Sequence, residues 1–148
     1  MIKEFGRVTI IKLRKTGKKD VNIDLQWFSK SLGLFGDRDK EKSCFRIFIE
    51  LLKSTRRNRP TPSDEIAFRT NITRATVIHH LNRLIESGIV LPTQTGYILR
   101  SDNLEGLIEE LKKDVIRTLN DLKDIASELD EELGFEKRNK QEKMKILE

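Results

Sequence analysis

The chain is poor in the residues that carry chemistry. It has a single cysteine, Cys44, among 148 residues, so an intrachain disulfide framework is excluded. Its two histidines, His79 and His80, leave few metal ligands and few general bases. The sequence contains no Gly-rich phosphate loop, no paired-histidine metal motif and no nucleophile elbow. We therefore expect a protein that is not an enzyme and that has no metal site and no cofactor.

Long apolar runs are also missing. No stretch approaches the roughly 18 apolar residues that a membrane span needs, and residues 1–30 lack the apolar core of a signal peptide. We therefore expect a cytoplasmic protein with no membrane partner. Hydrophobic and charged residues each make up 36% of the chain, so one copy forms only a modest core. An extended shape or a dimer would bury more.

The net charge of +5 is unevenly distributed along the chain. Residues 37–100 carry 12 basic against 7 acidic side chains, whereas residues 101–134 carry 4 basic against 11 acidic ones. The basic part suits a polyanionic partner. The acidic part would be repelled by phosphate, so we expect it to point away from any nucleic acid.

The N-terminal extension, residues 1–40, gives mixed signals. Residues 8–13 are apolar and β-branched, which predicts a strand, and residues 15–20 have the composition of a turn. The following apolar residues alternate as in a second strand, yet they also fit a helix behind an Asn22 N-cap. Both alternatives stay open, and so does the role of this extension in a dimer interface or at DNA.

Two helices are predicted next. Residues 42–54 have one apolar stripe at helical spacing, made of Phe45, Phe48, Ile49 and Leu52. A basic break at 54–60 follows. Thr61 is typical of an N-cap, with Pro62 in the first helical position and Asp64 reaching back to the cap, which predicts a short helix over 62–69.

A second cap and a hairpin complete this region. Thr73 is an N-cap, and the inward spacing of apolar residues predicts a helix over 74–87 that Gly88 ends. Residues 89–91 and 97–99 then read as two strands joined by a turn at 93–96. Two helices joined by about three residues cross steeply, so the second helix protrudes.

A long helix is predicted over 103–133, about 45 Å in length. Apolar residues recur along it with heptad spacing, which favours self-association into a homodimer through a coiled coil. The expected dimer contacts are Leu104, Ile108, Leu111, Val115, Leu119, Leu122, Ile125 and Leu129. Gly134 ends the helix, and residues 135–148 form a charged tail that we expect to be flexible.

This order of elements is that of a winged helix-turn-helix, and several segments resemble a known family. Asp64-Glu-Ile-Ala67, Thr73-Arg-Ala-Thr-Val77, His80-Leu-Asn-Arg-Leu84 and Glu86-Ser-Gly-Ile-Val90 are similar to the winged-helix transcriptional regulators of the ArsR and MarR type. The resemblance covers residues 42–100. It implies a winged helix-turn-helix domain over 41–101. Together with the elements predicted above, we expect a mainly α fold with a small β component, in which an N-terminal strand-containing extension precedes this domain and a dimerisation helix over 102–134 follows it.

The resemblance also implies site residues. The exposed start of the recognition helix is matched by Arg74, Ala75, Thr76, Ile78 and His79, and a position that meets the DNA backbone is matched by Arg83. Some ArsR-type proteins sense metals through a cysteine cluster, which Cys44 alone does not provide. From the residues themselves, we add Thr73 at the cap, a phosphate clamp of Arg56, Arg57 and Arg59, and wing contacts from Gln94, Thr95 and Arg100. The alternative for each is an ordinary solvated side chain.

We therefore expect a homodimeric regulator that reads double-stranded DNA, with the helix at 74–87 in the major groove. Any small-molecule effector is unknown. A second hypothesis is a winged-helix module that docks a protein and does not read DNA. A third, binding of RNA or single strands, would need exposed aromatics beside basic residues. Steep salt dependence would favour DNA over hydrophobic docking.

Overall fold

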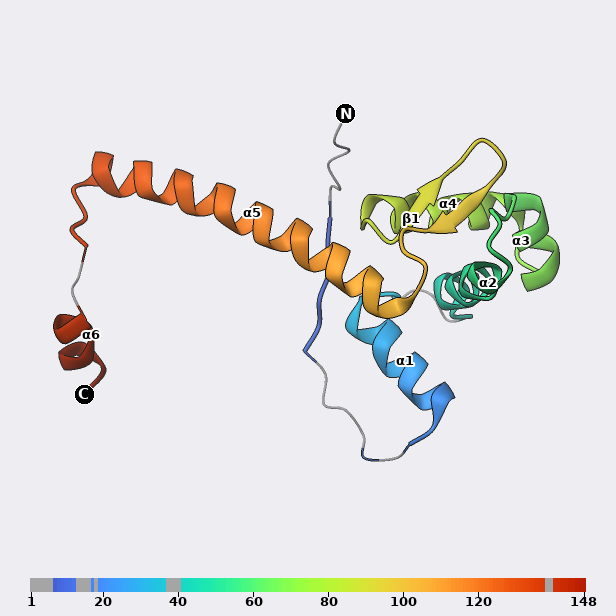
Figure 1. Cartoon of the computed structure of the whole chain (residues 1–148), viewed down its shortest axis with the longest axis horizontal. Helices are drawn as coiled ribbons and strands as arrows, with labels where there is room; N and C mark the ends of the chain where they lie inside the picture. The colour runs from blue at the N-terminus through green and yellow to red at the C-terminus, as the bar shows by residue number, and fades with distance from the viewer. Residues whose placement is uncertain (1–6, 13–16, 18, 37–40, 138–139) are drawn as a thin grey trace. The chain divides into compact units, whose positions relative to one another are not determined.

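The computed structural model describes residues 7–12, 17, 19–36, 41–137 and 140–148. Its elements are α1 (Val21–Ser31), α2 (Ser43–Arg57), α3 (Ser63–Thr70), α4 (Arg74–Glu86), β1 (Val90–Pro92), β2 (Tyr97–Leu99), α5 (Leu104–Leu133) and α6 (Lys140–Leu147) (Figure 1). The chain divides into two compact units, Met1–Lys112 and Lys113–Glu148. The predicted fold class, mainly α with a winged helix-turn-helix, is confirmed. Within the described residues, no helix is both long and apolar enough to cross a membrane.

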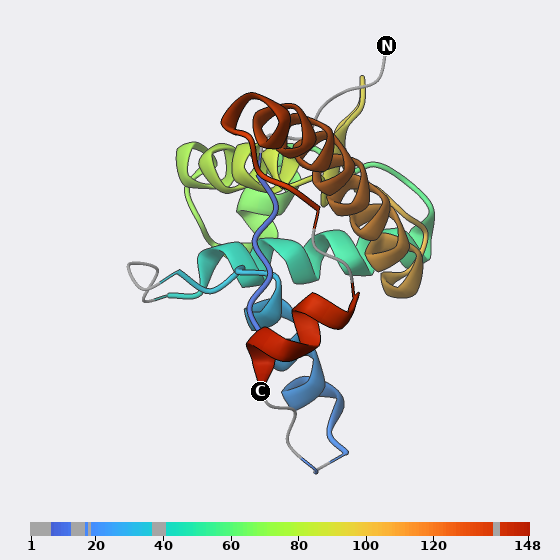
Figure 2. The same cartoon turned by 90° about the vertical axis from the view of Figure 1, so that its left-hand side faces the viewer.

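The core of the first unit lies between α2 and α4, which Figure 2 shows one above the other. Ile47, Phe48 and Leu51 of α2 are fully buried against Val77 and Leu81 of α4. Each such side chain contributes about 1.5–3 kcal/mol by leaving water. This packing holds the helix-turn-helix on one side and leaves the opposite side of α4 in solvent.

The buried stripe of α2 is shifted from the predicted one. Phe48 is buried as expected, but Phe45, Ile49 and Leu52 are only half-buried. The fully buried positions are instead Cys44, Ile47, Phe48 and Leu51, which also have helical spacing. Two adjacent apolar stripes share Phe48, and the sequence pattern alone did not decide which of them faces α4.

The structure settles the open reading of the N-terminal extension. Residues 21–31 form a helix, and its cap is Asp20 in place of the expected Asn22, because Asp20 Oδ1 accepts from the Asn22 N–H at 2.8 Å. With that partner strand absent, residues 8–12 form no strand, and the strand prediction is wrong there. Their segment is held by single hydrogen bonds, such as that from the Ile11 N–H to the Ser31 carbonyl at 2.7 Å. Leu13 and half of the predicted turn at 15–20, namely Lys15, Thr16 and Lys18, lie outside the described residues.

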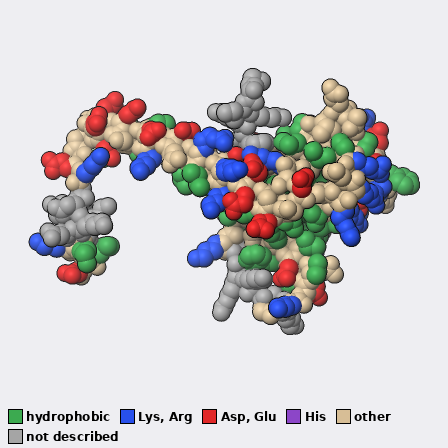
Figure 3. All heavy atoms as spheres, viewed as in Figure 1, with side chains coloured by type: hydrophobic (Ala, Val, Ile, Leu, Met, Phe, Trp, Pro, Cys, Tyr) green, Lys and Arg blue, Asp and Glu red, His purple; other side chains and the backbone are tan. Residues whose placement is uncertain are grey.

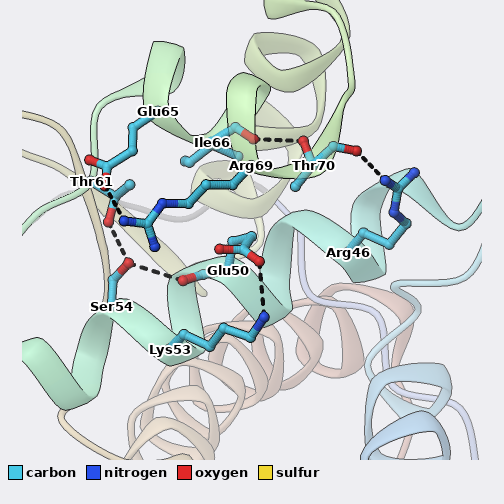
Figure 4. Close-up of polar contacts among 9 residues, drawn as sticks. All are labelled: Arg46, Glu50, Lys53, Ser54, Thr61, Glu65, Ile66, Arg69 and Thr70. Atoms are coloured by element: carbon cyan, nitrogen blue, oxygen red, sulfur yellow. Dashed lines mark hydrogen bonds and ion pairs between the residues drawn. The ribbon is translucent and has the colours of Figure 1, made fainter.

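The connection between α2 and α3 also differs from the prediction. α2 continues past Ser54 to Arg57 and ends at Asn58 in the left-handed region. The N-cap of α3 is Pro62, with no side-chain cap hydrogen bond, so Thr61 is not the cap. The Thr61 hydroxyl donates instead to Ser54 Oγ, and the Ser54 hydroxyl donates to the Glu50 carbonyl at 3.0 Å (Figure 4). Thr61 therefore contacts α2 through its side chain, and its backbone contacts the wing.

The wing is a two-stranded antiparallel hairpin tied to this connection. β1 and β2 pair with Leu91 opposite Ile98. Thr61 and Tyr97 then exchange two backbone hydrogen bonds of 2.9 Å each, forming an isolated bridge. We call this pairing the Thr61–Tyr97 bridge. Because it adds a third line of backbone to the hairpin, it fixes the wing against the helix-turn-helix.

Gly96 makes this close approach feasible. A Cβ on Gly96 would lie 2.5 Å from the Thr61 carbonyl carbon, and the Gly96 φ is +154°. We expect Gly96→Ala to lower the free energy of unfolding by about 1–3 kcal/mol, because backbone and not a flexible side chain must give way. Urea denaturation measures the loss. Gly17→Ala is the control, because nothing lies within 4 Å of Gly17. Equal stability of the two variants would contradict the close approach.

The start of α5 belongs to the core of the first unit. Leu107 and Leu111 are buried, and Leu104 packs against the same cluster. In the second unit Val115 is half-buried, whereas the apolar residues of α5 that follow it are exposed, including Leu119 at 57%, Leu122 at 56% and Leu129 at 48%. Residues 140–147 form α6, a helix that was not expected from the sequence, although lysine, glutamine, glutamate and leucine favour helices.

Candidate nucleic-acid interface

The first turn of α4 is fixed by its predicted cap, which the structure confirms. The backbone at Thr73 is extended, and its Oγ1 accepts from the Thr76 N–H at 3.3 Å. The Thr73 hydroxyl also donates to Thr76 Oγ1 at 2.9 Å. The first backbone amides of a helix have no partner within the helix, and this cap supplies one for the Thr76 N–H, which stabilises the start of α4. A capped helix start also carries a partial positive charge that favours phosphate.

The predicted recognition residues lie mostly on the solvent side of α4. Arg74, Ala75, His79 and Arg83 are exposed, and Thr76 and Ile78 are half-buried. Ile78 also packs against the core, so less of it is available to a partner. The buried side holds Val77, His80, Leu81 and Leu84. α4 thus has one face in the core and one face free for contact.

Arg74 has a partner that the sequence did not reveal. Its Nε lies 3.0 Å from Asp64 Oδ1, and the two side chains are 69% and 79% exposed. The pair brings the first turn of α3 beside the first turn of α4. Asp64 was expected to reach back to a Thr61 cap, and this expectation is wrong because Thr61 does not cap α3. An exposed pair is worth only about 0–1 kcal/mol, so Arg74 exchanges Asp64 readily for another partner.

The predicted phosphate clamp is exposed, but its three arginines differ. Arg56 and Arg57 lie in the last turn of α2, and Arg59 follows it. Arg59 pairs with Glu65 at 3.2 Å. The same Glu65 oxygen also pairs with Arg69 at 2.6 Å, and Figure 4 shows this second pair. Figure 3 shows Lys and Arg side chains gathered over the α2 and α3 end of the module. Among residues 7–12, 17, 19–36, 41–137 and 140–148, no carboxylate forms an ion pair with Arg56 or Arg57, whereas Glu65 pairs with Arg59.

The structure places the three predicted wing residues in two different locations. Gln94 and Thr95 are exposed in the turn between β1 and β2. The Arg100 side chain is only 13% exposed, lies 3.4 Å from Glu110, and donates to the Gly88 carbonyl at 3.5 Å. Arg100 therefore links the base of the wing to α5. The structure does not bring it to the tip with Gln94 and Thr95.

Phe68 on α3 is an exposed aromatic that the sequence pattern did not single out. Its side chain is 88% exposed, whereas Ile66 and Thr70 of the same helix are buried. A helical wheel of α3 would have placed Phe68 away from the core, because it lies two residues from each buried position. A surface phenylalanine beside Arg69 is a contact candidate.

The polar clusters do not form a metal centre. Among the described residues, no group of three or more His, Cys, Asp or Glu side chains could hold a metal ion. His79 and His80 meet edge to face with centroids 5.4 Å apart, and His80 is buried in α4. Cys44 is buried in α2.

Comparison with known proteins gives one match. Residues 49–91 match the family model described as bacterial regulatory protein, arsR family. No curated protein and no solved structure matches the chain. The matched segment begins within α2, spans α3 and α4, and ends in β1, so it covers the helical part of the interface described above and ends before the wing turn. Residues 49–91 therefore belong to an ArsR-type helix-turn-helix domain, which supports a DNA-binding transcriptional regulator.

Proposed function

We propose that this regulator binds double-stranded DNA in the cytoplasm as a symmetric homodimer, with α4 of each copy in the major groove. The observation that carries the proposal is the division of α4 into a buried face and an exposed face that starts at a firm cap. Arg74 and Ala75 occupy its first turn and His79 follows one turn later. The N-terminal residues of a recognition helix are those that reach base edges.

Phosphate contacts come from outside α4. Arg56 and Arg57 end α2, and Arg83 lies in the last turn of α4, all three exposed. Contacts of this kind position a protein on the duplex without reading sequence. Gln94 and Thr95 at the wing tip are suited to one further backbone contact, because the hairpin is short.

The exposed apolar side chains of the second unit supply the dimer contact. Past Lys112, six apolar positions follow the alternating three- and four-residue spacing of a coiled-coil seam, and we call this set the distal stripe: Val115, Leu119, Leu122, Ala126, Leu129 and Leu133. Val115 is half-buried, and the other five are exposed. Isolated apolar side chains on a surface are ordinary, but a seam about five turns long is not. Leu104 and Leu111 are used by the core of their own chain, so the distal stripe replaces them as the proposed interface.

A salt series tests DNA binding directly. Binding of the purified protein to mixed duplex DNA releases counterions in proportion to the phosphates contacted. A dimer contacting about 6–10 phosphates loses affinity by about 10³–10⁵-fold between 50 and 200 mM salt. Fluorescence anisotropy with labelled duplex measures the slope. A folded protein that does not bind at 50 mM salt would overturn the proposal.

A second candidate function is protein docking, and Phe68 is the observation that favours it. An 88% exposed phenylalanine is the kind of side chain that anchors a protein contact. Docking through it would depend weakly on salt, because it buries apolar surface and releases few counterions. The same salt series therefore separates the two functions.

A further inference from the structure

A cavity of about 330 Å³ lies between α1 and the start of α5 in the first unit. Figure 1 shows α1 next to the start of α5. The lining residues come from both: Val21, Asp24, Leu25, Trp27, Phe28 and Leu104. Sites for small molecules begin at about this volume and are lined mainly by apolar and aromatic side chains, with a few polar groups. This cavity has that composition.

Two buried polar atoms of the lining residues have no hydrogen-bond partner in the part of the chain that the structure describes. These atoms are Asp24 Oδ1 and Trp27 Nε1. Buried polar groups in proteins are nearly always paired, because an unpaired one loses its water without compensation. The energetic cost of lacking a partner is greatest for a carboxylate oxygen, because it carries charge. The lining residues thus carry one unmet acceptor and one unmet donor, three residues apart on α1.

The remaining lining is apolar, which defines the kind of molecule that fits. We propose that the cavity binds a small amphipathic amine. Its ammonium group pairs with the Asp24 carboxylate, and an oxygen elsewhere on the molecule accepts from Trp27 Nε1. Because Asp24 Oδ1 and Trp27 Nε1 are buried, both side chains must rotate toward the cavity as the molecule binds. Its apolar body packs on Phe28, Leu25 and Leu104. The Trp27 ring adds cation–π attraction for the ammonium group. An organic anion is repelled by Asp24.

The cavity is placed where an occupant reaches the DNA-binding domain. Leu104 is the first residue of α5, and Arg100, four residues earlier, joins the wing base to Glu110 of α5. A molecule held against Leu104 therefore contacts the segment that connects the wing to α5. We expect occupancy to change DNA affinity. That effect rests on the proposed function, whereas the amine site itself does not.

Trp27 is the only tryptophan, so its fluorescence reports on the cavity alone. The probe is 4-methoxyphenethylamine, which has an ammonium group, an apolar ring and an ether oxygen. Its controls are the alcohol and the carboxylate with the same ring, 4-methoxyphenylethanol and 4-methoxyphenylacetate. We expect a saturable change in Trp27 emission with the amine. Both controls should bind at least about 10-fold more weakly, since a charged hydrogen bond is lost.

Asp24→Asn keeps the size of the side chain and removes its charge. It should weaken amine binding by about 10-fold and leave the weak binding of the alcohol unchanged. The control variant is Glu105→Gln, which removes the same charge from an exposed residue next to Leu104 that does not line the cavity. This control should bind the amine like the wild type. Circular dichroism confirms that both variants are folded.

Three outcomes would overturn the amine site. The first is no saturable response of Trp27 to the amine. The second is equal affinity for the amine and the alcohol, or an equal loss in Asp24→Asn and Glu105→Gln. The third is emission that changes with protein concentration and not with amine, which would show that a second copy covers the cavity. DNA affinity measured with and without amine is a separate readout, so amine binding without DNA binding would sink only the proposed function.

Discussion

Replacing Arg74 with alanine should remove most of the sequence preference of the protein. Arg74 begins α4 at an exposed position, where an arginine bonds a guanine through two parallel hydrogen bonds. Losing such a contact costs about 1–3 kcal/mol in each half-site. The measurement compares affinities for a duplex selected from a random pool and for an unrelated duplex. We expect the first to fall steeply and the second to change little.

Arg57→Ala is the matched control for this change. It removes the same charge from an exposed arginine at the end of α2. A phosphate contact weakens binding to all sequences alike and lowers the salt slope by about one. If Arg74→Ala behaved in that way too, Arg74 would be a backbone contact and not a reader of bases. Asp64→Asn adds a second check, because it frees Arg74 from its ion pair and should preserve the sequence preference.

Replacing Leu122 with glutamate should separate the dimer. Leu122 lies in the middle of the distal stripe, and its side chain is 56% exposed in one copy. Burying a leucine contributes about 1.5–3 kcal/mol, and a symmetric interface contains the residue twice. The dissociation constant of the dimer should therefore rise by at least about 100-fold. Sedimentation equilibrium measures this rise, and DNA affinity should fall with it because two half-sites are no longer linked.

Asn120→Glu adds the same charge outside the distal stripe. Asn120 is exposed, and it occupies none of the stripe positions. This variant should remain a dimer with unchanged DNA affinity. A monomeric wild type, or a Leu122→Glu variant that stays dimeric, would show that the distal stripe is not the interface.

Local signals account for what could be read from the sequence. Thr73 caps α4 as predicted because capping involves only neighbouring backbone amides. Gly88, with φ +79°, ends the same helix region as predicted. Residues 90–92 and 97–99 were recognisable as a hairpin from the turn between them. The order of these elements was enough to predict the winged helix-turn-helix.

The failures involve partners distant in sequence. Thr61 has every local property of a cap, but its backbone pairs with Tyr97 and its hydroxyl is engaged with Ser54. Arg74 and Asp64 meet because two helices cross, which spacing along one helix does not show. The cavity beside α1 could not be predicted from the sequence for a further reason. The sequence left open whether residues 21–31 form a strand or a helix. Only a helix places Asp24 and Trp27, three residues apart, on the same face.

The Thr61–Tyr97 bridge has a consequence for protein engineering. Both of its hydrogen bonds involve Tyr97, the first residue of β2, and neither involves the turn at 93–95. The hairpin is therefore held at the base of the turn, and the tip of the turn is not held by this bridge. Residues grafted at Gln94 would lengthen the hairpin while its root stayed docked on the connection between α2 and α3. Regulators with longer reach along a duplex should thus be obtainable by insertion at one point, with the reading helix left untouched.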